Sequence, residues 1–287
     1  MNAGREKIYS KRLLIGVVLA HLFIISVCIY ILLPILRVVQ LSFQPLEYYF
    51  SIERSLIPKV ITFDNFRRLF TETLFPRWLL NSTIIASLQT ILTTIVCTLA
   101  AYAYTVYDFR GKEKSFILLL STMMIPFPVG VPALFILFRS LNLINTYLAV
   151  VLPGIASVFS LFFMRSYMEA SIIRELIDAG RVDGASEFQI FYKVVLPLLK
   201  PGIAALATMI FTSSFNDFFW PLIALRTEDM YTVQVGLPTW NVIIGSAKVK
   251  FDLLAAGVVM STIPPLIIFV LLQRYLIMGL SLGAVKR

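Results

Sequence analysis

The sequence predicts an all-α fold of six membrane-spanning helices, and three observations support this prediction. Hydrophobic residues make up 59% of the 287 residues and charged residues only 14%, too few to cover the surface of a soluble domain of this length. The mean hydropathy is +0.86. Several apolar windows reach the roughly 20 residues that a helix needs to cross a bilayer. We therefore predict a polytopic α-helical membrane protein.

The first apolar window covers residues 13–36 and follows a short basic segment, residues 1–12. This window is longer than the apolar core of a secretory signal, and no small-residue cleavage site follows it. We expect it to form the first span instead of a cleaved leader. A polar stretch then leads to the second window, residues 79–104.

The third window, residues 116–138, contains three prolines in the run IPFPVGVP. Because a proline inside a span removes a backbone hydrogen bond, we expect this span to be bent or locally unwound. The remaining windows cover residues 147–163, 202–225 and 253–272. Residues 13–274 are thus predicted to form one membrane domain, followed by a tail of residues 275–287.

The positions of lysine and arginine predict the orientation of the spans, because basic loops are retained in the cytoplasm. With the amino terminus inside, more than half of the 25 lysines and arginines fall in inner segments. Six spans then place both termini in the cytoplasm. The formal charge of +9 is spread over loops and termini and forms no single basic stripe, so we expect no nucleic-acid partner.

The residue types that carry catalysis or bind metals are sparse. Cys28 and Cys97 lie in apolar windows and suggest neither a disulfide framework nor a metal site, and His21 is the one histidine. No nucleophile–base pair or paired-carboxylate site is evident, and the chain has no GxxxxGK[ST] phosphate loop. We expect no catalysis, no metal and no cofactor in this chain.

The most polar interior stretch carries a helical pattern. Apolar residues recur at three- and four-residue steps over residues 171–182, Gly184 allows a turn, and a second helix follows with Phe188, Phe191 and Val195 on one face. Its small residues suit close contact with another protein's backbone: Ala179, Gly180, Gly184 and Ala185. The alternative is an interfacial helix that packs on the protein's own inner face.

The run ELIDAGRVDGAS, followed by FYKVVLPLLKP, resembles the EAA loop of binding-protein-dependent ABC importers. That loop has the pattern Glu-Ala-Ala, three residues, Gly, then a spacer that ends in an apolar-x-Leu-Pro group. The match falls on Asp178, Ala179, Gly180, Gly184, Val194, Leu196 and Pro197. Asp178 stands where Glu is usual, and Gly180 stands where the second Ala is usual. INTYLAVVLP, SSFNDFFWPL and LSLGAVKR are similar to the smaller permease subunit of the carbohydrate-uptake group, which includes the maltose and glycerol-3-phosphate importers.

This resemblance implies a type I ABC importer permease fold in a bacterial or archaeal cytoplasmic membrane. It also implies a heterodimer with a second permease, two cytoplasmic ATPases that bind ATP and Mg²⁺, an external solute-binding protein and a carbohydrate substrate. The coupling loop, residues 171–201, would then contact the ATPase. The implied contact residues are Asp178, Ala179, Gly180, Asp183, Gly184, Ala185, Ser186, Phe191, Leu196 and Pro197. In the tail, Lys286 and Arg287 would reach the ATPases or bind anionic lipid.

Asp217 is the one acidic residue inside an apolar window, where a charge is costly. Together with Asn216 and Ser213 it is a candidate lining group for a polar substrate. Two other readings stay open for Asp217: a hydrogen bond between the two permeases, or a position wetted at the membrane surface.

Two alternative functions also stay open. One is a glycerol-3-phosphate or polyol importer, for which a basic pocket is expected, although no intramembrane Arg or Lys is evident. The other is an autonomous channel or secondary transporter, which predicts a homo-oligomer and makes the docking helix superfluous.

Overall fold

The computed structural model describes residues 3–48, 60–172, 174–240 and 251–284, and these contain helices and turns but no strand. The chain divides into two units by contact, residues 1–72 with 243–260 and residues 73–242 with 261–287. The first unit contains α1 (Ala3–Ser42), η1 (Leu46–Tyr48), α2 (Asp64–Thr71) and all but the last residue of α14 (Phe251–Ser261). The second contains α3 (Phe75–Val106), α4 (Lys112–Thr122), α5 (Phe127–Ser140), α6 (Tyr147–Ile155), α7 (Val158–Ser171), α8 (Arg174–Val182), α9 (Glu187–Ile190), η2 (Phe191–Val195), α10 (Leu196–Leu198), α11 (Lys200–Phe215), α12 (Phe219–Ala224), η3 (Glu228–Met230), α13 (Val233–Thr239) and α15 (Ile263–Ala284).

The described residues contain three helices that are long and apolar enough to cross a membrane: Gly16–Ser42, Phe75–Val106 and Phe251–Tyr275. Three bent helix pairs meet the same criteria when their two parts are taken together. They are α4 with α5, bent by 94°, α6 with α7, bent by 43°, and Glu187–Leu198 with α11, bent by 75°. With each bent pair counted as one span, the described residues provide six spans, which agrees with the all-α, six-span prediction.

The third predicted span is bent, as its prolines indicated. Its helices α4 and α5 are separated at residues 123–126, where Pro126 has extended backbone and Pro128 occupies the first turn of α5. The fifth window, residues 202–225, is also divided, although no break was predicted there. Residues 216–218 separate α11 from α12, and there the Asp217 carboxylate accepts a hydrogen bond from the Phe219 backbone amide at 3.2 Å.

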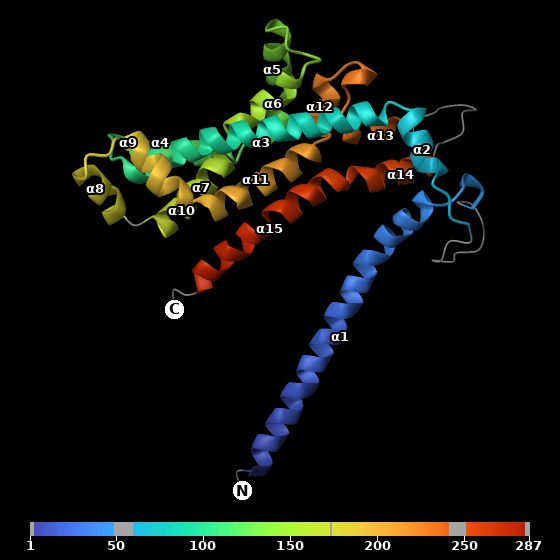
Figure 1. Cartoon of the computed structure of the whole chain (residues 1–287), viewed down its shortest axis with the longest axis horizontal. Coiled ribbons are helices and arrows are strands. Elements are labelled where there is room, and N and C mark those ends of the chain that lie inside the picture. Colours follow the sequence, from blue (N-terminus) through green and yellow to red (C-terminus); the bar gives the residue numbers. More distant parts are fainter. Residues whose placement is uncertain (1–2, 49–59, 173, 241–250, 285–287) are drawn as a thin grey trace. The chain divides into compact units, whose positions relative to one another are not determined.

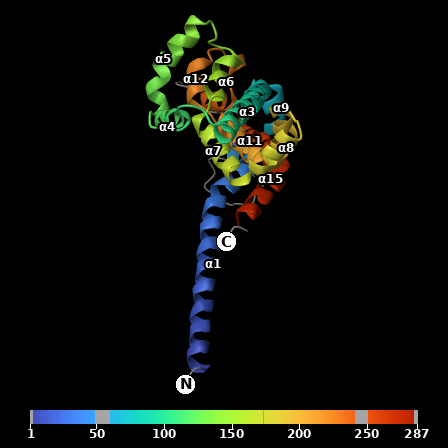
Figure 2. The same cartoon turned by 90° about the vertical axis from the view of Figure 1, so that its left-hand side faces the viewer.

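In the second unit, α3 runs along the bundle and packs against α6, α7, α11 and α13, while α11 also packs against α15 (Figure 1). One hydrophobic cluster lies where α7, α11 and the carboxyl end of α3 meet α8 to α10. A second cluster joins α5, α6 and α12 around Trp220, and Figure 2 shows α5 beside α6 and α12. The unit therefore has separate hydrophobic cores along α3, one that includes Tyr102 near its carboxyl end and one that includes Ile85.

In the first unit, the end of α1 is tied to α2, a helix that the sequence reasoning missed. The buried Asn65 side chain donates hydrogen bonds to the carbonyls of Ser42 at 3.0 Å and Gln44 at 2.8 Å. The ring of Phe43 packs against Phe63 and Phe66. Acid–base pairs at helical spacing within residues 64–72 were the available signal for α2.

Candidate functional site

The predicted helix–turn–helix forms at one end of the second unit, with α8 and α9 joined by a tight turn. Gly184 has φ +77°. Its amide donates to the Arg181 carbonyl at 3.1 Å, and the Ala185 amide donates to the Gly180 carbonyl at 3.0 Å, which is the Schellman arrangement at a helix end. Ser186 then caps α9 through the Gln189 amide. The predicted glycine turn is therefore confirmed.

We expect the loss of stability caused by substitutions at Gly184 to depend on backbone strain alone, because no neighbouring atom lies within 4 Å of a Cβ added there. Gly184→Ala should destabilise the turn by about 1 kcal/mol. Gly184→Asn should destabilise it less and Gly184→Val more, since asparagine tolerates this backbone region and β-branched residues do not. Hydrogen exchange of the amides of residues 185–190 would measure the loss. Equal effects for asparagine and valine would contradict this account.

The α8–α10 element, residues 174–198, is anchored in the core of its own unit. Ile177 is 2% exposed, Ile190 1% and Val195 0%. A Cβ added to Gly180 would lie 3.1 Å from Ile190 Cγ1, so the small residue lets α8 approach α9 closely. The element is therefore held firmly from beneath.

The face predicted for the second helix is wrong in one position. Phe188 is 75% exposed, and Ile190 takes its place in the core. The cause is η2, a π-helix over Phe191–Val195. Its wider turn aligns residues five apart, so Ile190 and Val195 share the buried face, whereas α-helical spacing would have paired Phe188 with Val195.

Three apolar side chains of this element are exposed, and we call them together the outer patch: Val182, Phe188 and Tyr192. Val182 is 88% exposed, and the rings of Phe188 and Tyr192 stack with centroids 6.5 Å apart. Exposed charged residues, including Asp178 and Asp183, lie on the same element. This end of the unit therefore has the mixed polarity of a wetted surface and not that of a lipid-facing one.

The predicted contact residues occupy two kinds of position. Those exposed are Asp178, Ala179, Asp183, Gly184, Ser186 and Pro197, and those partly buried are Gly180, Ala185, Phe191 and Leu196. Ala185 and Phe191 pack against the hydrophobic cluster of the unit itself. Lys286 and Arg287 lie outside the described residues.

Arg181 ties the element together and was not among the predicted site residues. Its Nε donates to Glu187 Oε1 at 2.7 Å, and its Nη1 donates to Asp178 Oδ1 at 3.2 Å. The Tyr107 hydroxyl, just after α3, donates to Glu187 Oε2 at 2.8 Å. The hydrogen bond with Glu187 raises the pKa of Arg181, which therefore stays charged throughout the physiological range.

Arg165, on α7, is a second cation that the sequence reasoning did not single out. It donates to Glu113 of α4 and to Glu169, both at 2.8 Å, and its guanidinium lies 4.0 Å from the centre of the Phe116 ring. These contacts hold α4 against α7. A cavity of about 450 Å³, lined by charged residues of both signs, lies between them and α8.

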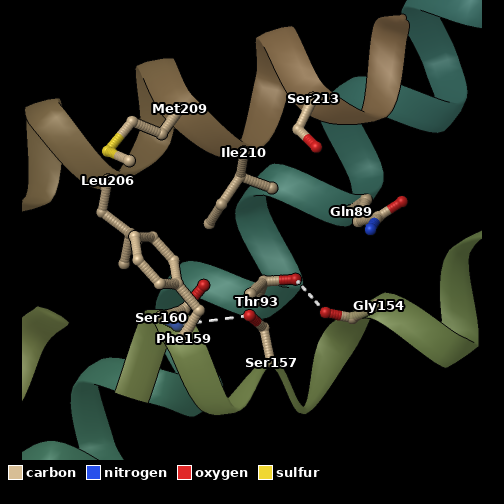
Figure 3. A pocket seen from close by; sticks show the side chains of 10 residues that line it. All are labelled: Gln89, Thr93, Gly154, Ser157, Phe159, Ser160, Leu206, Met209, Ile210 and Ser213. Atoms are coloured by element: carbon tan, nitrogen blue, oxygen red, sulfur yellow. Dashed lines mark hydrogen bonds between the residues drawn. The ribbon is translucent and has the colours of Figure 1, made fainter. Parts of the chain in front are cut away.

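A separate cleft of about 270 Å³ lies between α3, α11 and the junction of α6 with α7 (Figure 3). We call it the junction cleft. Its polar lining residues are Gln89, Thr93, Ser157, Ser160 and Ser213. Of the three predicted lining residues, Ser213 belongs to it, while Asn216 and Asp217 do not. Asn216 Oδ1 instead accepts a hydrogen bond from Gln234, and Asp217 Oδ1 accepts one from the Phe219 backbone amide.

Metal ligands are not gathered anywhere in the part of the chain that the structure describes, since no group of three or more His, Cys, Asp or Glu residues there could hold an ion. The candidate features among the described residues are the α8–α10 element with its outer patch, the charged cavity beside Arg165 and the junction cleft.

The chain matches the model of a family described as binding-protein-dependent transport system inner membrane component over residues 94–281. It is 40% identical over 256 residues to the arabinooligosaccharides transport system permease protein AraQ of Halalkalibacterium halodurans, covering 88% of this chain and 90% of the relative. It is 31% identical over 272 residues to the maltodextrin transport system permease protein MalD of Streptococcus pneumoniae, covering 93% and 95%.

Among solved structures, the fold is similar to a chain of a bacterial ABC transporter involved in the import of the acidic polysaccharide alginate. The TM-score is 0.81 at 25% identity, and the match covers 92% of this chain and 96% of that chain.

Proposed function

The chain belongs to the family of binding-protein-dependent transport system inner membrane components, and from this membership we propose that it is a permease subunit of an ATP-driven carbohydrate importer. The names of its relatives, which include an arabinooligosaccharide and a maltodextrin permease, support a sugar or oligosaccharide as the substrate. The subunit forms half of a pore with a second, related permease. An external solute-binding protein delivers the sugar to it.

Two copies of a cytoplasmic ATPase bind ATP and Mg²⁺ and supply the hydrolysis, and this subunit is not catalytic. Both termini lie on the cytoplasmic side. The course of α15 supports this for the carboxyl end, because in Figure 1 it runs toward the end of the second unit that carries α8 to α10. The basic residues of the first twelve positions support it for the amino end.

The outer patch is the observation that carries the proposal for ATPase coupling. Three exposed apolar side chains on a charged, wetted surface are costly to leave in water and are typical of a protein contact. Beneath them, Ile177 and Ile190 fix the element to α3, α7 and α11. Movement of the ATPase is thereby transmitted to the spans as a rigid displacement of α8 to α10.

We expect Phe188→Asp to abolish copurification of the ATPase, because it replaces the ring stacked on Tyr192 with a charge in the outer patch. Phe109→Asp is the matched control, since Phe109 is 45% exposed but lies outside the α8–α10 element. The measurement is the amount of ATPase retained by tagged subunit in detergent, together with ATP hydrolysis in proteoliposomes. Normal retention by Phe188→Asp would refute docking at this patch.

The autonomous channel or secondary transporter is the competing function. It predicts that the purified chain forms an active homo-oligomer without an ATPase. Copurification with a second permease and two ATPase copies supports the importer, and sugar uptake by the chain alone would overturn it.

A further inference from the structure

We propose that the junction cleft binds a sugar unit of the transported carbohydrate, so that this subunit contacts the substrate directly. The inference rests on the proposed importer function and assigns a substrate site to this chain. The hydrogen-bonding groups of the cleft, its apolar wall, the break in the span beside it and the polarity of α3 all support it.

The cleft offers free hydrogen-bonding groups. Gln89 Oε1 accepts a hydrogen bond from Ser214 at 2.9 Å, whereas its amide nitrogen has no hydrogen-bond partner among the described residues. The Ser213 side chain is exposed and likewise makes no hydrogen bond within the described part of the chain. Figure 3 shows both groups bordering the space between α11 and the α6–α7 junction. An amide donor and a hydroxyl are complementary to the hydroxyls of a sugar.

An apolar wall accompanies these polar groups. Phe159 is 43% exposed and Met209 45% exposed, and both line the cleft. Small-molecule sites commonly combine an apolar lining with a few placed polar groups. The ring of Phe159 provides a flat apolar surface for the carbon–hydrogen face of a sugar ring.

The bilayer span is broken beside the cleft. Helix α6 ends at Ile155 and α7 begins at Val158, and the freed carbonyls are satisfied by α3 side chains. Thr93 Oγ1 donates to the Gly154 carbonyl at 3.1 Å, and Cys97 Sγ donates to the Ser157 carbonyl at 3.4 Å. Irregular backbone at membrane depth is tolerated where it is buried in protein or lines a cavity, and broken helices mark substrate sites in many transporters.

The two faces of α3 differ in polarity. Its exposed side chains Leu88, Ile95 and Leu99 are apolar, as expected of a surface against lipid or a partner span. The stripe formed by Gln89, Thr93 and Cys97, four residues apart, faces α6, α7 and α11 instead. The cleft therefore lies against the polar face of α3.

The chemistry of the lining selects a neutral ligand. Among the residues that the structure describes, no Arg, Lys, Asp or Glu lines the junction cleft. A phosphorylated polyol would leave its charge unpaired there at high cost, whereas a neutral sugar exchanges water hydrogen bonds for those of the amide and hydroxyl groups. Neutral carbohydrate is thus the ligand class.

The test uses Ser213→Cys in a Cys28→Ser background, within the complete transporter reconstituted in proteoliposomes with its binding protein. Cys97 remains in this background and is 2% exposed, so labelling of the Cys28→Ser parent measures how much reagent reacts with Cys97. We expect a water-soluble thiosulfonate to label Cys at 213, and maltotriose or arabinotriose with the binding protein to slow labelling at least threefold. Thr212→Cys, an exposed neighbour outside the cleft, should show no such protection.

A second variant, Ser213→Phe, fills the cleft without removing an internal contact. We expect sugar uptake to fall at least tenfold while ATP hydrolysis stimulated by the binding protein is retained, and Thr212→Phe should transport normally. Absence of labelling at 213, labelling without sugar protection, or normal uptake by Ser213→Phe would each overturn the cleft as a sugar site. Failure of the proposed function is distinct, because the Cys28→Ser parent would then show neither uptake of these sugars nor stimulated ATP hydrolysis.

Discussion

Gly236→Ala should destabilise the subunit by about 3 kcal/mol, because the added methyl group has no room. A Cβ at Gly236 would lie 2.2 Å from Trp78 Cε3 and 2.3 Å from Trp78 Cδ2. The indole cannot move aside easily. Its nitrogen donates to the Glu228 carbonyl at 2.7 Å, and its ring packs 5.4 Å from that of Trp240. The substitution must therefore displace either the tryptophan or α13.

Gly130→Ala is the matched control, since this helical glycine has no atom within 4 Å of an added Cβ. There we expect no loss, or a gain of up to about 1 kcal/mol, because alanine has the better helix propensity. Unfolding in detergent, followed by circular dichroism during titration with sodium dodecyl sulfate, would give both changes in the free energy of unfolding. Equal stabilities for the two variants would show that the Trp78 contact is not as tight as the structure has it.

Arg68→Ala should likewise cost about 3 kcal/mol, because it leaves a buried carboxylate without its cation. In the first unit, Arg68 Nη1 donates to Asp252 Oδ2 at 2.8 Å, and the Asp252 side chain is only 4% exposed. The other carboxylate oxygen, Oδ1, has no hydrogen-bond partner among the described residues. The arginine is 32% exposed, which places the cost at the low end of the range for broken buried pairs.

The double variant Arg68→Met with Asp252→Leu separates the charge from the packing. We expect it to recover most of the lost stability, because two apolar side chains of similar size leave no unpaired charge. The same detergent titration of Arg68→Met, Asp252→Leu and the double variant would measure the coupling energy of the pair. Additive losses would mean that the pair does not contribute as an ion pair.

The spans were predictable because bilayer thickness and hydropathy act on each window separately. The same holds for the bend between α4 and α5, since prolines such as Pro126 impose it locally. The break between α6 and α7 was not predicted. It depends on hydrogen bonds from α3 side chains to residues far away in the sequence. Thr93, for example, donates to the Gly154 carbonyl, 61 residues away.

The helix–turn–helix was predictable at Gly184, where a positive φ requires a permissive residue. The exposure of Phe188 was not, because a π turn cannot be recognised from α-helical spacing. The sequence left three interpretations open for Asp217, and none of them included the hydrogen bond that its carboxylate accepts from the Phe219 backbone amide. Whether Asp217 also contacts substrate or a second permease stays a prediction, as do the contact residues of the α8–α10 element.

The junction between α6 and α7 is held through main-chain carbonyls, which every residue type possesses. Thr93 and Cys97 therefore donate hydrogen bonds to backbone carbonyls, and these bonds do not depend on the side chains at the junction. Phe159 and Met209 can be exchanged without removing either of these hydrogen bonds. If the proposed sugar site is correct, changes at Phe159 and Met209 would alter sugar selection while the hydrogen bonds of the α6–α7 junction stay intact.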